Sequence, residues 1–401
     1  MITLFVYWCE MHNKIREIVD KYGLMLYDAD RCKRFQELKS VDYTFYIKGI
    51  EQRKSMETRK TVSIKDVART ANVSLATVSR VINNSENVKP EMRELVQNTI
   101  RELGYSPNHA ARSLVKRKTN CIGVVVNNLH DPFFYDLIKG FEHGAQQTKY
   151  NVIFCSVLGG DADSKENYVK YLTNGVVDGV VLYGSYLNDR KVLDYLKESN
   201  HVDYVMIEND VRECSCNKLL IDNYGGSKKA VEHLMQRGHK KIAHICGNPN
   251  KKVTQERMNG YLDCIRDAGL EIKEGYIQYT STDYCSGYDK MKMLISLDNR
   301  PSAVFCSDDA IASFAVRAVM DSGLRVPEDV SIIGFDNQRI LPDGYRGPLI
   351  TSVEQPLYQI GQDSIHILAE QLEYPEEAKL IRHVYETKLI EKETVGYCGG
   401  I

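Results

Sequence analysis

The chain has 401 residues, enough for two or three domains, and its composition of 43% hydrophobic and 26% charged residues is ordinary for a globular protein. Its formal net charge is −2, and no apolar run reaches the length of a membrane span, so we expect no membrane partner. Eleven cysteines are scattered without a CxxC pair or a paired Cys/His spacing. This usage indicates free thiols in a reducing cytoplasm, with no disulfide framework and no metal site.

Residues 1–55 have no clear hydrophobic period. The opening MITLFVYWC is apolar but short and lacks a basic lead, so it does not predict a signal peptide. Acidic residues offset much of the lysine and arginine of this segment, which therefore lacks the character of a DNA-binding arm. We expect residues 1–55 to be poorly ordered or not translated, with Met56 as the functional start. A small accessory element is the alternative.

Residues 62–103 hold three closely spaced helical patterns. Ser63 and Asp66 have the spacing of a capping box, Ser74 is suited to cap the second helix, and Pro90 suits the first turn of the third. Two helices joined by a tight turn, with small polar residues at the start of the second, form a helix-turn-helix. The second helix of that motif lies in the DNA major groove.

The same region is basic. Between residues 57 and 118 there are 12 Lys and Arg against 6 Asp and Glu, a net +6, which leaves −8 for the rest of the chain. A basic module joined to an acidic body is typical of a nucleic-acid-binding domain.

Three short sequences in this region, IKDVA, VSLATVSRVIN and LGYSPNHAARSL, occur in the order and at the spacing of the lactose/galactose repressor (LacI/GalR) family, which the chain resembles. The resemblance implies a DNA-binding domain over residues 56–105 and a hinge helix and linker over residues 106–121. It also implies a leucine that enters the minor groove, matched here by Leu114. The DNA-contacting residues implied by the family are Ser74, Leu75, Ala76, Thr77, Ser79, Arg80, Asn83, Tyr105, Asn108, Ala111 and Leu114.

From residue 121 onward, short apolar runs alternate with longer amphipathic stretches. This alternation predicts an α/β fold with parallel sheets that are covered on both faces. The expected strands are 122–126, 152–157, 179–183, 204–207, 218–221, 241–246, 276–279, 303–306 and 330–335. The expected helices include 134–147, 224–237, 255–268 and 310–322. Nine strands are many for one open sheet, so two similar halves with a break near residues 222–226 are expected.

The body also resembles the LacI/GalR family, through DPFF, DGVVL, DNYGG, HLMQRGHKKIAHICG, RMNGY, PSAVFCSDDAIA, LRVPEDVSIIGFDN and TSVEQPL. The resemblance covers roughly residues 57–391. It implies two Rossmann-like lobes of the periplasmic-binding-protein type over residues 122–391, with an effector bound between them, and leaves residues 392–401 as a tail.

Ligands of open α/β sheets bind at the carboxyl ends of the strands, so the polar residues that follow each apolar run are candidates. Carboxylates, amides and aromatic rings are the groups that bind sugars. Combined with the family's pattern, this gives a predicted effector set of Phe133, Phe134, Asp161, Glu208, Arg257, Asp308, Asp336 and Gln355. The family more often has an aspartate at the position of Glu208.

Some nearby residues have a structural interpretation. For Asp309 we favour a helix cap, and for Asp336 we favour the ligand. Asn223, Gly225 and Gly226 are expected in a turn or crossover. His233, His239 and His244 lack the spacing of metal ligands and are expected to be structural.

The resemblance implies a cytoplasmic repressor of carbohydrate-utilisation genes that binds a double-stranded operator as a homodimer. Its effector would be a sugar or sugar phosphate, and no cofactor is implied. A catabolite-control-type regulator with a partner protein as corepressor is the alternative. A sugar-transport component would not need residues 62–114. An enzyme is disfavoured because the sequence has no nucleophile elbow, P-loop or GxGxxG motif.

Overall fold

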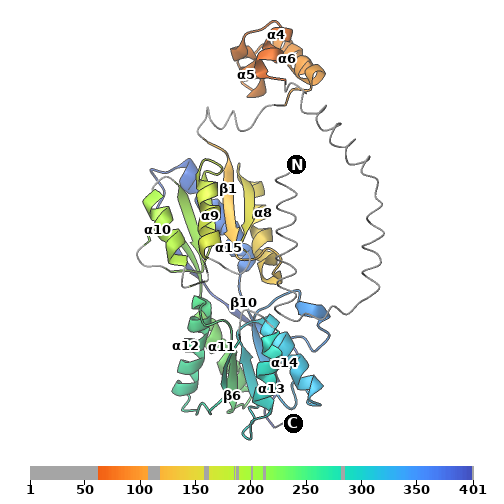
Figure 1. Cartoon of the computed structure of the whole chain (residues 1–401), viewed down its shortest axis with the longest axis vertical. Helices are drawn as coiled ribbons and strands as arrows, with labels where there is room; N and C mark the ends of the chain where they lie inside the picture. The colour runs from red at the N-terminus through yellow and green to blue at the C-terminus, as the bar shows by residue number, and fades with distance from the viewer. Residues whose placement is uncertain are drawn as a thin grey trace, which may run out of the picture. The chain divides into compact units, whose positions relative to one another are not determined.

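The computed structural model describes residues 62–106, 118–157, 162–184, 186, 189–199, 202–210, 214–280 and 285–399 (Figure 1). These residues fall into two compact units, a small helical one that ends by residue 106 and a larger one from residue 118. None of the helices in the described ranges is long and apolar enough to cross a lipid bilayer. The expectations for residues 1–55, for a start at Met56 and for most of the hinge lie outside the described residues.

The small unit contains helices α4 (Ile64–Thr70), α5 (Leu75–Ile82) and α6 (Pro90–Leu103). The predicted capping box is present, because the Ser63 hydroxyl accepts from the Asp66 N–H while the Asp66 carboxylate accepts from the Ser63 N–H at 3.0 Å. The Ser74 hydroxyl accepts from the Thr77 N–H and so begins α5. The three helices share one core, formed by Val67, Ala68, Ala71, Val78, Val81 and Val96.

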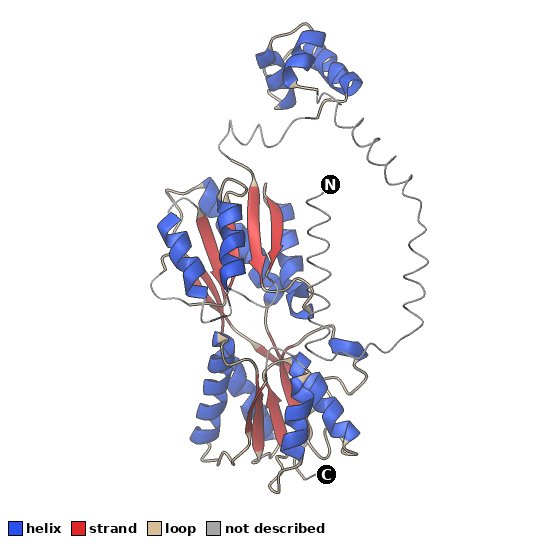
Figure 2. Cartoon of the chain, viewed as in Figure 1, coloured by secondary structure: helices blue, strands red, loops and turns tan. Residues whose placement is uncertain are grey.

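The large unit consists of two lobes, each built on a six-stranded sheet (Figure 2). Lobe 1 has the strand order β11-β5-β4-β3-β1-β2, and all of its strand pairs are parallel. Its elements are β1 (Cys121–Val126), η2 (Pro132–Phe134), α8 (Tyr135–Gln147), β2 (Asn151–Ser156), α9 (Ala162–Thr173), β3 (Gly179–Tyr183), α10 (Arg190–Ser199), β4 (Asp203–Ile207), β5 (Asn217–Ile221), α15 (Leu357–Glu373) and β11 (Arg382–Tyr385).

Lobe 2 has the strand order β12-β10-β9-β8-β6-β7, and only the pair β10–β12 is antiparallel among the described strands. Its elements are α11 (Asn223–Gln236), β6 (Ile242–Cys246), α12 (Lys252–Asp267), β7 (Ile277–Tyr279), α13 (Ser286–Ile295), β8 (Ala303–Cys306), α14 (Asp309–Asp321), β9 (Ser331–Asp336), η5 (Pro342–Gly344), β10 (Thr351–Glu354) and β12 (Lys388–Ile390). The central strands are buried along their whole length, as expected for parallel sheets with helices on both faces.

The chain passes between the lobes three times. The first passage follows β5 and falls at the break predicted near residues 222–226. The second passage leads from β10 to α15, and the third from β11 to β12; the strand–helix alternation predicted neither of them. Helix α15 returns to lobe 1 and packs closely on α8, where Gly140 and Gly361 face each other without room for a Cβ atom.

The predicted α/β class, strands and helices are confirmed. The sequence patterns did not predict four helices and three strands of the large unit. They are α9, α10, α13, α15, β10, β11 and β12. The segment that we set apart as a tail belongs to lobe 2 up to residue 399. There the Thr394 carbonyl accepts from the Ile332 N–H at 2.8 Å, and Val395 is buried in the core.

Candidate functional site

The first candidate site is the exposed face of α5. Val78 and Val81 are buried against the other two helices, whereas Leu75, Ala76 and Arg80 are exposed. Leu75 is 46% exposed, so its side chain is accessible to a ligand. An apolar pair and an arginine on one exposed face suit thymine methyl groups and the acceptor edge of guanine.

The other DNA-contacting candidates have different surroundings. Ser74 and Asn83 are exposed, and Thr77 and Ser79 are half-buried. The Ser74 and Asn83 side chains also form hydrogen bonds within the unit. Ser74 caps α5, and the Asn83 amide nitrogen donates to the Ser79 carbonyl oxygen at 2.9 Å. Tyr105 packs against the helical core. Asn108, Ala111 and Leu114 lie outside the described residues.

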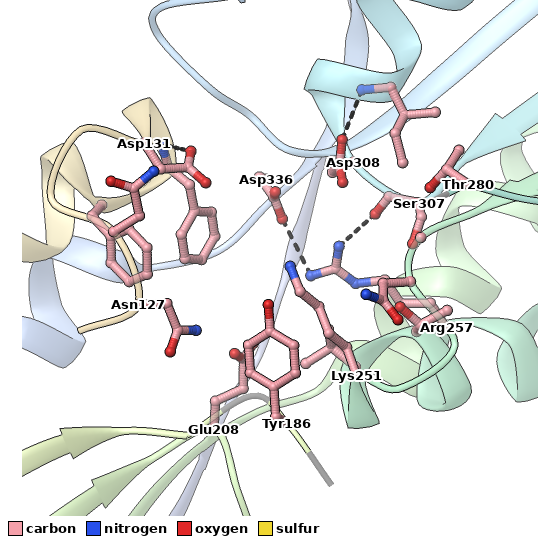
Figure 3. Close-up of a pocket in the computed structure, with 18 of the residues that line it drawn as sticks. Asn127, Asp131, Tyr186, Glu208, Lys251, Arg257, Thr280, Ser307, Asp308 and Asp336 are labelled. Atoms are coloured by element: carbon pink, nitrogen blue, oxygen red, sulfur yellow. Dashed lines mark hydrogen bonds and ion pairs between the residues drawn. The ribbon is translucent and has the colours of Figure 1, made fainter. Parts of the chain in front are cut away.

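The second candidate site is a cavity of about 380 Å³ between the two lobes of the large unit (Figure 3). Its walls come from the carboxyl ends of strands in both sheets, the edge at which open α/β sheets bind ligands. The lining residues are Asn127, Asn128, Asp131, Phe133, Phe134, Tyr183, Tyr186, Glu208, Gly247, Asn248, Lys251, Val253, Thr254, Arg257, Thr280, Ser307, Asp308, Ile311, Asp336 and Gln338.

Arg257 and Asp336 form a buried ion pair at the lobe 2 side of the cavity. Arg257 Nη2 donates to Asp336 Oδ1 at 3.2 Å, Nη1 donates to the Ser307 carbonyl oxygen, and Nε donates to Asn223 Oδ1 at 2.9 Å. The guanidinium also lies 3.7 Å from the ring centroid of Phe335. Burial raises the pKa of Asp336 well above its ordinary value, and the charge of Arg257 opposes that shift.

Gln355 does not line the cavity but lies behind Asp336, to whose Oδ1 its amide nitrogen donates. In this structure Gln355 contacts Asp336 rather than the cavity, so its predicted effector contact stays a prediction. Arg257 and Asp336 both line the cavity. Their burial at 4% and 8% exposure shows that they also belong to the core of lobe 2.

Asp308 lines the cavity as predicted, and it also takes the capping role that the sequence suggested for Asp309. Asp308 is the N-cap of α14, accepting from the Ile311 N–H at 2.7 Å, and it also lines the cavity. Asp309 caps no helix: its carboxylate accepts from the Ser352 hydroxyl at 2.7 Å and from the Gln338 N–H at 2.8 Å. The capping interpretation of Asp309 is thus wrong. Burial raises the pKa of Asp309 to about 7.

Glu208 presents an unsatisfied acceptor at the cavity. Its backbone is left-handed, with φ of 73°, and its side chain follows the buried strand β4. Tyr183 hydrogen-bonds to the carboxylate, yet Oε2 is buried without a hydrogen-bond partner among the described residues. Burial raises the pKa of Glu208. A buried acceptor without a partner is costly, so a ligand donor at this position would be favoured.

Aromatic rings form the lobe 1 wall of the cavity. Phe133 and Phe134 meet edge to face with centroids 5.0 Å apart, and Phe134 meets Tyr183 in the same manner at 5.0 Å. Tyr186 lies beyond them and faces Lys251 of lobe 2 (Figure 3). Such a wall offers apolar contact next to the polar groups of lobe 2.

The structure brings together Phe133, Phe134, Glu208, Arg257, Asp308 and Asp336 of the predicted effector set. Asp161 lies outside the described residues. The predicted set omitted Tyr183, Tyr186, Lys251, Thr280 and Ser307, which all line the cavity. Thr280 and Ser307 directly follow β7 and β8. They would have been predicted if every polar residue that follows a strand had been taken as a candidate. No pattern singled out Lys251.

The histidines fill structural positions. His239 is hydrogen-bonded to the Ser302 hydroxyl at 3.0 Å and to the Gly396 carbonyl oxygen at 3.1 Å. His244 stacks on Phe305 with centroids 4.5 Å apart, and burial lowers its pKa to about 4. Within the described ranges, no group of three or more His, Cys, Asp or Glu side chains is arranged to hold a metal ion.

Comparisons with known proteins match both units of the chain. Residues 63–108 match the bacterial regulatory proteins of the lacI family, and residues 231–395 match a periplasmic binding protein-like domain. The HTH-type transcriptional repressor PurR of Mannheimia succiniciproducens is 31% identical over 331 residues, which are 82% of this chain and 98% of the relative. The chain belongs to the LacI family.

Other members of the LacI family are similar over comparable lengths. Catabolite control protein A of Priestia megaterium is 34% identical, over 77% of this chain and 92% of that protein. The solved structure of the transcriptional regulator CelR in complex with cellobiose is 30% identical, with a TM-score of 0.61, and the match covers 83% of this chain and 99% of CelR. As a LacI-family member, this chain is a DNA-binding transcriptional regulator with a small-molecule effector site in its body.

We predict that Arg80→Ala relaxes the preference for one base at one position of each half-site. The arginine can donate two hydrogen bonds to guanine, and their loss removes about 1–3 kcal/mol of discrimination. Selection of bound sequences from random DNA measures this preference. The control is Arg101→Ala on α6, where Arg101 is exposed and hydrogen-bonded to Asn98. Identical selected sequences for Arg80→Ala and the unchanged protein would exclude base contact by Arg80.

We predict that Arg257→Ala lowers the free energy of unfolding of lobe 2 by about 3–5 kcal/mol, because it leaves the buried Asp336 carboxylate unpaired. Urea unfolding followed by circular dichroism measures the loss. Arg266→Ala is the matched control on the same helix, since Arg266 pairs with Asp263 at the surface, and its loss should cost less than about 1 kcal/mol. Equal stability of the two variants would mean that the buried pair contributes little.

Proposed function

We propose that this protein is a repressor that binds a two-fold operator as a dimer and that an uncharged sugar, bound between the lobes, controls DNA binding. It works in the cytoplasm, where the chromosome lies, and it catalyses no reaction. The observation that carries the effector part is the composition of the cavity, which combines many hydrogen-bond acceptors with an aromatic wall.

The charges of the cavity favour an effector without an anionic group. Among the described residues, four carboxyl groups line it, from Asp131, Glu208, Asp308 and Asp336, against two basic groups, from Lys251 and Arg257. Arg257 is already paired with Asp336. A phosphate beside these groups would disfavour their ionised forms further, and burial already raises the pKa of Glu208 and of Asp336.

The hydrogen-bonding groups favour a polyol. Each sugar hydroxyl can donate to a carboxylate and accept from an amide, an ammonium or another hydroxyl. The cavity supplies both kinds of partner, including Asn127, Lys251 and Thr280. The apolar faces of Phe133 and Phe134 suit the CH groups of a sugar ring. The similarity to CelR, whose structure contains cellobiose, supports the same class of effector.

A second candidate is control by a partner protein acting as corepressor. The similarity to catabolite control protein A favours it. The two mechanisms differ in an observable way, because a repressor controlled only by a partner protein would not be stabilised by free sugars.

The dimer surface that we propose lies in lobe 2. Met320 of α14, Ile340 and Leu349 are 50%, 55% and 60% exposed, and α14 and residues 342–347 also line a surface groove that contains Phe314 and Tyr345. Met320 lines this groove, and Ile340 and Leu349 lie on either side of residues 342–347 in the sequence, so we take these exposed apolar side chains as the interaction surface. A two-fold operator requires two headpieces, and an interface between two copies of the chain uses the same patch on both.

We predict that at least one uncharged sugar stabilises the protein against heating, whereas sugar phosphates do not. A ligand at 100 times its Kd adds about 2.7 kcal/mol of stability. A thermal-shift panel of D-ribose, D-glucose, cellobiose and glucose 6-phosphate, followed by operator binding with each active sugar, measures this effect. The control is Arg257→Lys, which disturbs the cavity and should lose the stabilisation. A response to glucose 6-phosphate alone, or to no sugar, would contradict the proposal.

We predict that the unchanged protein sediments as a dimer at micromolar concentration and that Ile340→Asp combined with Leu349→Asp shifts it toward the monomer, because two charges would be buried at each copy of the patch. Sedimentation velocity measures both states. Tyr171→Asp is the control, since Tyr171 is 63% exposed on α9 of the other lobe. A double variant that still sediments as a dimer would place the interface elsewhere.

A further inference from the structure

A buried ion pair lies behind the aromatic wall of the cavity. Lys165 of α9 and Asp189 are both fully buried, and Lys165 Nζ donates to Asp189 Oδ1 at 2.6 Å. Neither residue lines the cavity. Removing two charges from water is costly, and apolar residues of similar volume are often as stable or more stable in such a place. Core stability alone therefore does not explain the pair.

Lys165 and Asp189 form hydrogen bonds with the backbone of two cavity-lining tyrosines, Tyr183 and Tyr186. Asp189 Oδ2 accepts from the Tyr186 backbone N–H at 3.1 Å, and the Asp189 N–H donates to the Tyr186 carbonyl oxygen at 3.2 Å. Lys165 Nζ also donates to the Tyr183 carbonyl oxygen at 3.3 Å and lies 5.8 Å from the ring centroid of Tyr186. One ammonium and one carboxylate thus hold the backbone of both tyrosines.

Tyr186 in turn reaches the other lobe. Its backbone forms an isolated antiparallel bridge with Lys251, and Lys251 Nζ lies 5.7 Å from its ring centroid. Both residues line the cavity, and Figure 3 shows their side chains next to each other. The position of Tyr186 therefore affects both the lobe 1 wall and a contact between the lobes.

We infer that Lys165 and Asp189 are positioning residues of the effector site, which hold Tyr183 and Tyr186 in the geometry that binds the effector and meets Lys251. This inference rests on the proposed function of the cavity. A wall that is already ordered loses less conformational entropy when the ligand binds, so the pair raises affinity without touching the ligand.

Two variants separate positioning from simple stabilisation. Lys165→Met leaves the Asp189 carboxylate buried and unpaired, so it loses both stability and the order of Tyr186. Lys165→Met combined with Asp189→Leu removes both charges and should recover much of the stability. It cannot restore the bond from the Tyr186 N–H to the Asp189 carboxylate or the bond from Lys165 to the Tyr183 carbonyl oxygen, although the backbone bond from residue 189 to Tyr186 remains. If the pair only stabilised lobe 1, this double variant would behave like the unchanged protein.

The control is Asp178→Asn in the same lobe. Asp178 lies before β3, at the opposite end of the sheet from the cavity, and accepts from the Thr119 N–H at 2.6 Å, the Thr119 hydroxyl at 2.8 Å and the Asn120 N–H at 2.8 Å. Its replacement weakens lobe 1 without changing the tyrosine wall.

The position of Tyr186 is measured without any ligand, by ¹⁹F NMR of the full chain labelled with 3-fluorotyrosine, with the Tyr186 signal assigned from Tyr186→Phe. We expect this signal to shift or broaden in Lys165→Met and in the double variant, and to stay unchanged in Asp178→Asn. An unchanged Tyr186 signal in the double variant would overturn the inference.

Binding is then measured by calorimetry with D-ribose and cellobiose as probes. We expect the double variant to raise the Kd of a binding sugar roughly tenfold, the size of effect that outer positioning contacts commonly have around metal sites. Equal affinity of the double variant and the unchanged protein would also overturn the inference. If neither sugar binds the unchanged protein, the proposed effector class is wrong for these probes, and the NMR result still decides the positioning role.

Discussion

The buried pair of Arg257 and Asp336 is the interaction on which the large unit depends. Arg257 extends from α12 and binds the end of β9, the Ser307 carbonyl oxygen after β8, and Asn223 at the start of α11. Gln355 holds Asp336 from the segment that follows β10. Asn223 and Gln355 lie at the first two passages of the chain between the lobes. A ligand that contacts Arg257 or Asp336 thus contacts a residue that is itself hydrogen-bonded to a segment joining the lobes.

The two lobes supply different kinds of chemical groups to the cavity. Lobe 2 supplies the ion pair, Asp308 and hydroxyl groups from a rigid sheet edge, whereas lobe 1 supplies rings and the unsatisfied Glu208 carboxylate. Burial raises the pKa of Asp336 even beside Arg257, and the neighbouring carboxyl groups of Asp308, Asp309 and Glu208 add to that shift. Neutral hydrogen-bond donors relieve that crowding, and a further anion would increase it.

The headpiece depends on a simpler constraint. Its core is small, so its fold relies on helix caps and on valines that face inward, with Ser63 and Ser74 starting α4 and α5. The face that remains exposed on α5 carries Leu75, Ala76 and Arg80. These residues are free for DNA because the core does not use them.

Local signals in the sequence determined the helix caps, the inward face of α5, the apolar strands and the carboxylates at strand ends, because each depends on neighbours a few residues away. The family's motifs added Arg257 and the two-lobed body. Only the tertiary structure decided that α15 packs on α8, that Gln355 supports Asp336, and that Asp308 rather than Asp309 caps α14. It alone brought Lys165 to Asp189 and Tyr186 to Lys251. Apart from the Asp308 cap, these contacts join residues that lie from 19 to 215 positions apart, and no local period in a sequence encodes such pairings.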